Sequence, residues 1–144
     1  MDKLKIAIGS DHGGFRYKGI IEEYLKSKGV EFVDVGTNST ESCDYPVYAK
    51  KVAEKVANGE VDRGILICGT GIGMSITANK VKGIRASLCG DTFSARATRA
   101  HNNSNILCLG ERVIGENLAL DIVDIWLNTP FEGGRHQRRI DMIE

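Results

Sequence analysis

The sequence predicts an α/β protein: a three-layer αβα sandwich built on a five-stranded parallel sheet, with a helical tail at the C-terminus. Five short apolar runs are spread along the 144 residues, and each is followed by a segment with helical character. The chain has two prolines, Pro46 and Pro130, and no linker or low-complexity stretch interrupts the alternation. Alternating strands and helices favour a parallel sheet that is covered on both faces, so we expect a single domain over residues 1–144.

The first half of the chain predicts two strand–helix units. Apolar runs at residues 4–8 and 30–35 have the length and composition of buried strands. Apolar residues then recur at helical spacing over residues 17–25 and again over residues 49–57. Each helical pattern stops within a few residues of a glycine, which commonly follows the end of a helix.

The second half predicts three further units. Apolar runs at residues 64–68, 84–89 and 106–109 each lead into a glycine and then into a segment with helical character. In open α/β sheets, ligands bind outside the carboxyl ends of the strands. We therefore expect the functional residues directly after the strands, in Asp11-His12, Cys68–Gly73, Gly90-Asp91 and Gly110–Arg112.

Composition and charge narrow the classes of function. Lys plus Arg and Asp plus Glu both number 19, so no overall field attracts nucleic acid or an anionic membrane. The sequence shows no signal-peptide pattern and no run of about 20 apolar residues. Its four cysteines form no C-x-x-C pair, which favours reduced thiols. We expect a cytoplasmic protein that binds a small charged ligand, with no nucleic-acid or membrane partner.

The segment Gly69-Thr70-Gly71-Ile72-Gly73 follows a buried strand and opens a helix. Its backbone N–H groups can converge on an anion at the positive end of that helix. The segment is neither a P-loop nor a G-x-G-x-x-G dinucleotide motif, and position 74 is Met where a Cys-x5-Arg phosphatase needs arginine. A tight turn in which glycine only permits close packing is the alternative. Three glycines beside a thiol favour anion binding.

Cys68 lies immediately before this glycine segment. A helix N-terminus favours the thiolate over the thiol, so Cys68 could act as a base or a nucleophile near neutral pH. The alternative is an inert strand cysteine. We favour that alternative for Cys89 and Cys108, because a cysteine inside an apolar run behaves as a small hydrophobic residue.

Three other groups of side chains suit a phosphorylated ligand. Asp11 and His12 follow the first strand, although Asp11 could instead cap the next helix. His101 ends a short helix and can move a proton near pH 7, although a lone histidine at a helix end is more often structural. Arg135 and Arg139 lie four residues apart, and such like charges favour an anion between them, although a solvated helix end explains them equally well.

Seven segments are together far more specific than any one of them alone: Gly9-Ser10-Asp11-His12-Gly13-Gly14-Phe15, Asp44-Tyr45-Pro46, Gly64–Gly73, Gly83-Ile84-Arg85-Ala86, His101-Asn102, Gly110-Glu111-Arg112-Val113 and Glu132-Gly133-Gly134-Arg135-His136. Through them the chain resembles the family of ribose-5-phosphate isomerase B and its galactose-6-phosphate isomerase relatives, over nearly every residue. The resemblance implies a Rossmann-like sheet and the interconversion of an aldose phosphate with its ketose through a cis-enediolate, without a metal or an organic cofactor.

The resemblance also implies catalytic roles. Cys68 resembles the base that moves the proton between C1 and C2, and Thr70 resembles the hydroxyl that assists at the substrate oxygens. His101 resembles the group that opens the furanose ring, with Asp11 at the ring hydroxyls. The enediolate would be held by backbone N–H groups of the glycine segment, at Gly69, Gly71 and Gly73.

The remaining implied roles concern binding. Asn102 would contact the enediolate and Tyr45 would border the sugar, while the phosphate would be bound by His12, Arg112, Arg135 and Arg139. In this family the site is shared, with His101, Asn102 and the arginines coming from the neighbouring subunit of a homodimer, which could pair further into a tetramer. A six-carbon sugar phosphate as substrate, and a noncatalytic phosphate-binding module, are the alternative functions.

Overall fold

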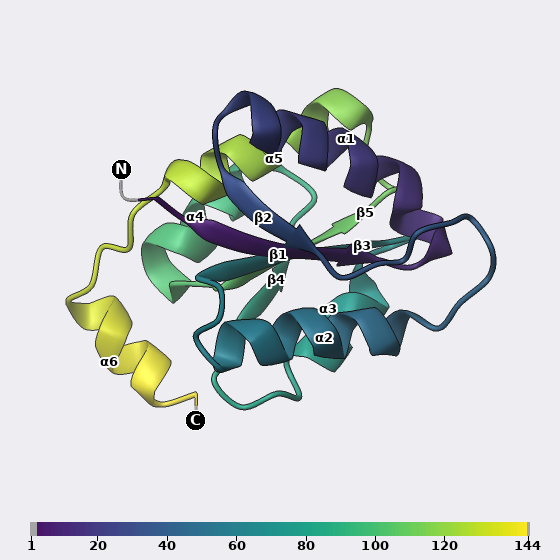
Figure 1. Ribbon diagram of the computed structural model, residues 1–144. Helices are drawn as coiled ribbons and strands as arrows, with labels where there is room; N and C mark the ends of the chain where they lie inside the picture. The colour runs from purple at the N-terminus through teal and green to yellow at the C-terminus, as the bar shows by residue number, and fades with distance from the viewer. Residues whose placement is uncertain (1–2, 144) are drawn as a thin grey trace.

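The strands form one parallel sheet in the computed structural model, which describes residues 3–143 (Figure 1). The order across the sheet is β2-β1-β3-β5-β4, and every neighbouring pair is parallel. This confirms the predicted sheet. The strands are β1 (Lys5–Ser10), β2 (Glu31–Asp34), β3 (Arg63–Cys68), β4 (Ala86–Leu88) and β5 (Ile106–Gly110).

Helices cover both faces of the sheet, as the sequence predicts. Helices α1, α4 and α5 pack on one face, and α2 and α3 pack on the other (Figure 1). The predicted C-terminal tail is α6, which lies against α4. The bounds are α1 (Phe15–Ser27), α2 (Tyr45–Ala57), α3 (Ile72–Ala78), α4 (Thr92–Asn102), α5 (Glu116–Asn128) and α6 (Arg135–Asp141), with a short 3-10 helix at His12–Gly14.

Alternation along the central strands divides the core into two clusters. In β3, Ile65 and Ile67 join the cluster under α1 and α5, whereas Leu66 and Cys68 join the cluster under α2 and α3. These side chains are almost completely buried, and burying each large aliphatic one contributes about 1.5–3 kcal/mol. The pleat of β3 therefore decides which face carries the Cys68 thiol.

Helix α2 begins earlier than the sequence pattern predicts. The apolar repeat begins at Ala49, but the helix begins at Tyr45, with Pro46 in its first turn. Proline is favoured there because its missing N–H has no partner in the first turn of a helix. The early start places the Tyr45 ring at the helix end that faces the glycine segment. Across residues 3–143, no helix is long and apolar enough to span a membrane.

A half-buried carboxylate on α1 makes stability depend on pH. Glu22 lies 3.8 Å from the buried Lys18 ammonium, which also pairs with Asp34. Burial, followed by the neighbouring Asp34 carboxylate, raises the pKa of Glu22 from its ordinary value of 4.5 to about 7. The folded chain therefore holds this proton more tightly than the unfolded chain does. Stability from this group is present below pH 4.5 and is lost as the pH rises to about 7.

We expect Glu22→Gln to stabilise the protein at pH 8, because the amide avoids the cost of a half-buried negative charge. After allowance for screening by solvent, the gain in unfolding free energy is about 1–2 kcal/mol. Urea unfolding at pH 8 and at pH 4 measures it, and the gain should disappear at pH 4. An equal effect at both pH values would contradict the assignment.

Candidate active site

The segments that follow β3 and β5 meet at the edge of the sheet where these strands end, which we call the carboxyl edge. Cys68 and Gly110 are register partners at the ends of the two strands. Beyond them, the Glu111 N–H donates to the Cys68 carbonyl at 2.9 Å and the Arg112 N–H donates to the Gly69 carbonyl at 3.0 Å. These bonds fasten the start of the glycine segment to the loop that carries Arg112.

The glycine segment folds back on the Cys68 sulfur. The Gly71 N–H donates to Cys68 Sγ at 3.1 Å, and the sulfur is almost fully buried. Gly71 has φ of 80°, and a Cβ there would lie 2.9 Å from the Leu109 carbonyl oxygen, so only glycine fits this turn. A backbone N–H aimed at sulfur stabilises negative charge on it. The exposed Thr70 hydroxyl accepts from the Ile72 N–H at 3.2 Å.

Asp11 and His12 lie beside this segment. Asp11 Oδ1 accepts from the N–H groups of Gly13 and Gly14, at 2.9 and 3.2 Å, so it caps the 3-10 turn as the alternative interpretation expects. His12 Nδ1 accepts from the Cys43 N–H at 3.1 Å. A backbone N–H can only donate, so Nδ1 is unprotonated and the proton of the neutral ring lies on Nε2. His12 thus offers an N–H donor to an anion.

Tyr45 and Arg112 flank the glycine segment. A Cβ on Gly73 would lie 2.5 Å from Tyr45 Cε1, so the tyrosine ring covers the first turn of α3. A Cβ on Gly69 would lie 3.5 Å from Arg112 Cδ, so the arginine side chain lies over the start of the segment. The carboxyl edge therefore gathers most of the residues singled out by sequence, namely Asp11, His12, Tyr45, Cys68, Gly69, Thr70, Gly71, Gly73 and Arg112.

The other predicted site residues lie at the opposite edge, where the strands begin, which we call the amino edge. His101 and Asn102 end α4, and the Asn102 carbonyl accepts from Arg85 Nε at 3.1 Å, directly before β4 begins. Figure 1 shows α6, which carries Arg135 and Arg139, beside the end of the sheet where β1 begins. The six residues of β3 span about 20 Å. Within one chain, the two groups do not form one site.

Buried Arg99 holds the amino edge together. It donates to the Ser104 carbonyl at 2.7 Å and to the Thr129 carbonyl at 3.3 Å, which ties the end of α4 to the chain that leads into α6. Burial, with the charges of Arg63 and Arg85 adding to it, lowers the pKa of Arg99 to about 10. Arg99 is still charged at neutral pH, so these bonds persist.

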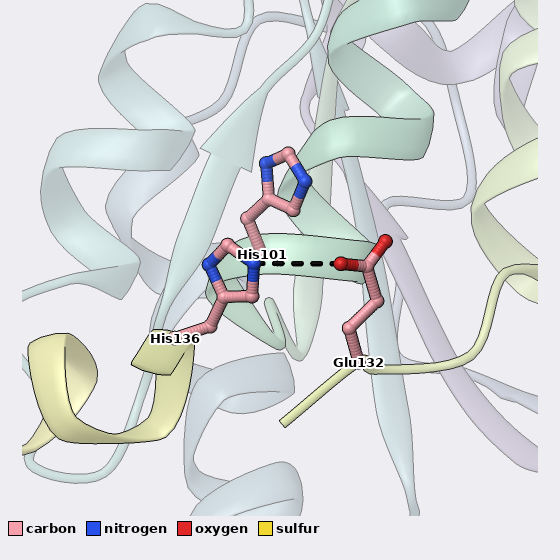
Figure 2. Close-up of side chains that lie close together, drawn as sticks. All are labelled: His101, Glu132 and His136. Atoms are coloured by element: carbon pink, nitrogen blue, oxygen red, sulfur yellow. Dashed lines mark ion pairs between the residues drawn. The ribbon is translucent and has the colours of Figure 1, made fainter. Parts of the chain in front are cut away.

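Glu132 and His136, two residues of the amino edge that the predicted site does not include, form a cluster with His101. The His136 ring stacks on the His101 ring, with centroids 4.4 Å apart and an angle of 13° between the planes. His136 Nε2 lies 3.4 Å from Glu132 Oε1 (Figure 2). Both residues belong to the segment Glu132–His136 that carries the family resemblance, and their four-residue spacing is the signal that could have identified them.

Cys89 and Cys108 also lie in the core. Burial, with a smaller contribution from Asp91, raises the pKa of the Cys89 thiol to about 11. Complete burial, followed by the neighbouring cysteines, raises the pKa of Cys108 still further. Both groups stay protonated at neutral pH, which agrees with the inert role predicted for them. All four cysteines are free thiols.

Comparison with known proteins identifies the family. Residues 6–143 match the family described as Ribose/Galactose Isomerase. The chain belongs to this family. It is 55% identical over 139 residues to ribose-5-phosphate isomerase B of Escherichia coli (strain K12), a match that covers 96% of this chain and 93% of that protein. The family predicted from the sequence segments is thus confirmed.

Solved structures of family members superpose closely on this fold. Ribose-5-phosphate isomerase B of Clostridium thermocellum is 58% identical, with a TM-score of 0.96, and the match covers 97% of this chain and 95% of that one. The Mycoplasma genitalium enzyme, solved with bound ribulose-5-phosphate, is 49% identical with a TM-score of 0.93, and the match covers 96% and 93% of the two chains. The Rossmann-like αβα architecture is the fold of the family.

Proposed function

We propose that this isomerase interconverts ribose 5-phosphate and ribulose 5-phosphate. The observation that carries the proposal is the carboxyl edge, where a buried thiol, a turn of backbone N–H groups and the cationic side chain of Arg112 lie together. The relatives named ribose-5-phosphate isomerase B, at 55% and 58% identity, support the same substrate. A single domain, residues 1–144, would carry this activity in the cytoplasm.

In the proposed mechanism, Cys68 is the base. Its thiolate removes the proton from C2 of the open-chain aldose, and the electron pair moves to form the C1–C2 double bond of an enediolate. The N–H groups of the glycine segment stabilise the oxyanion, and Thr70 moves a proton between the two oxygens. The Cys68 thiol then returns its proton to C1 to give the ketose. These steps are proton transfers, so side-chain acids and bases suffice.

The proposed active site is shared by two chains. His101 and Asn102 are too far from Cys68 in one chain to act on the same sugar, so a second subunit would bring its amino edge to the carboxyl edge of the first. As the bond between C1 and the ring oxygen breaks, His101 would take the proton of the anomeric hydroxyl and return it to the ring oxygen, which becomes the C4 hydroxyl. Asn102 would contact the enediolate. Arg112 lies over Gly69 of its own chain, so of the three arginines only Arg135 and Arg139 would come from the other subunit. The phosphate would lie between His12 and Arg112 of one subunit and Arg135 and Arg139 of the other.

A substrate panel tests this function. We expect kcat/KM for ribose 5-phosphate to exceed that for allose 6-phosphate and galactose 6-phosphate by about tenfold or more, because an additional carbon must fit the same pocket. A higher value for either six-carbon sugar would reassign the substrate. Binding of all three sugars without turnover would instead support a noncatalytic phosphate-binding module.

A further inference from the structure

We propose that His101, Glu132 and His136 form a binding site for a divalent transition metal such as Zn²⁺. One donor atom from each residue lies within 4.8 Å of the donor atoms of the other two. Figure 2 shows the three side chains converging from the end of α4, the segment before α6, and α6 itself. Nothing in the isomerase chemistry proposed above uses Glu132 or requires this convergence.

The backbone brings Glu132 to the two histidines. Gly133 and Gly134 both have positive φ, 71° and 59°, and the turn that they make places Glu132 beside His136. The Glu132 N–H also donates to the Ala100 carbonyl at 3.0 Å, one residue before His101. The backbone of Glu132 is thus fastened to the end of α4 and joined by a short turn to α6, the two elements that carry the imidazoles.

His136 provides the second and independent observation. Its side chain is 9% exposed, and its Nε2 atom is buried without a hydrogen bond to any described residue. Buried nitrogens of this kind are normally bonded. Nε2 instead faces Glu132 Oε1 at 3.4 Å, a distance that allows an ion pair but no good hydrogen bond, and a cation between the two atoms would be coordinated by both.

The donor set selects the class of metal. Two imidazole nitrogens and one carboxylate suit Zn²⁺ and its neighbours, and three protein ligands leave a fourth position open. Zinc–ligand bonds of about 2.0–2.2 Å place tetrahedral donors about 3.3–3.6 Å apart. His136 Nε2 and Glu132 Oε1 already lie 3.4 Å apart, so the cluster, whose donors lie within 4.8 Å of one another, must contract only slightly. His136 is held by burial, whereas His101 and Glu132 are exposed and can tilt toward it.

The surroundings predict the fourth ligand and the consequence of binding. Arg139 lines the same pocket, of about 360 Å³, together with His101 and His136. Its charge opposes a bare cation and favours an anion in the open position. A metal on the His101 ring would occupy the nitrogen needed for ring opening, so binding would inhibit the isomerase. This inhibition rests on the proposed function, whereas metal binding does not.

Titration of the full chain with Co²⁺, followed by visible absorption, tests the site, and calorimetry with Zn²⁺ gives the affinity. We expect about one ion per chain, with tetrahedral cobalt bands and no thiolate-to-cobalt charge-transfer band. Glu132→Gln and His136→Asn should each weaken binding by at least about tenfold. Asp141→Asn is the matched control: Asp141 is a carboxylate of the neighbouring helix α6 that accepts a hydrogen bond from Gln137, and the metal affinity of this variant should not change.

An unchanged affinity in Glu132→Gln, or a thiolate charge-transfer band, would overturn the metal site. Glu132 is exposed, so this variant decides the question even if His136→Asn fails to fold, and circular dichroism checks both. Zn²⁺ should also inhibit the wild-type isomerase, reversibly with chelator. Cobalt binding without inhibition would overturn that consequence alone. An inactive wild-type chain would count against the proposed function and leave the cobalt result standing.

Discussion

Replacing Cys68 with alanine is expected to lower kcat/KM for ribose 5-phosphate by about 10²- to 10⁴-fold, because the base that removes the C2 proton is lost. The fold should persist, since alanine fits the space that the thiol leaves, at a cost of about 1 kcal/mol. Steady-state kinetics with ribose 5-phosphate measures the first effect, and thermal unfolding measures the second.

Cys108→Ala is the matched control for this experiment. Cys108 lies in the same core cluster as Cys68 and is completely buried, but its raised pKa keeps it a thiol at neutral pH. It should lose comparable stability and keep its activity. If Cys68→Ala retained turnover within tenfold of the wild type, Cys68 would not be the base.

Two inactive variants should restore activity when they are mixed as subunits. We expect Cys68→Ala and His101→Ala each to abolish most turnover alone, because each removes one half of every shared site. In a mixed dimer, one site receives the intact carboxyl edge of one chain and the intact amino edge of the other. Random pairing should therefore recover about a quarter of the wild-type activity. Co-expression with two different affinity tags isolates the mixed dimers, which should have about half of the wild-type activity because one of their two sites is intact.

A second mixture provides the control for shared sites. His101 and Arg139 both lie at the amino edge, so a mixed dimer of His101→Ala with Arg139→Ala has one damaged residue in every site and should gain nothing. Recovery with this pair as well would mean that subunit exchange alone explains the gain. Failure of the first pair, in dimers whose mixed composition is verified, would place the whole site within one chain.

The sequence predicts most of the sheet because its apolar runs are unambiguous. Runs such as residues 64–68 are too short for a typical helix and end in glycine, which favours buried strands, and each glycine after them marks the carboxyl edge. Helix starts are less visible: the start of α2 at Tyr45 depends on Pro46 rather than on any apolar repeat. The role of Asp11 also stayed open, since a carboxylate after a strand can bind ligand or cap the next turn, and the cap forms.

At the amino edge, sequence patterns predict the position of His101 but not its contacts. The order of strand and helix already implies that His101, at the end of α4, lies opposite Cys68. The meeting of His101 with His136 is different, because it depends on a turn at Gly133 and Gly134 and on stacking between residues far apart in sequence. Spacing along the chain can suggest the pair of Glu132 and His136 but does not encode its contact with His101, so only the structure reveals the whole cluster.

The separation of the two edges has a consequence for how activity arises in a cell. If the site is shared as proposed, a newly synthesised chain carries both the carboxyl-edge and the amino-edge residues but cannot catalyse the reaction alone. Catalysis would begin only when two chains collide, so its onset would be second order in chain concentration. Because β3 separates the two edges of one chain, activity would remain low until enough chains have accumulated to form dimers.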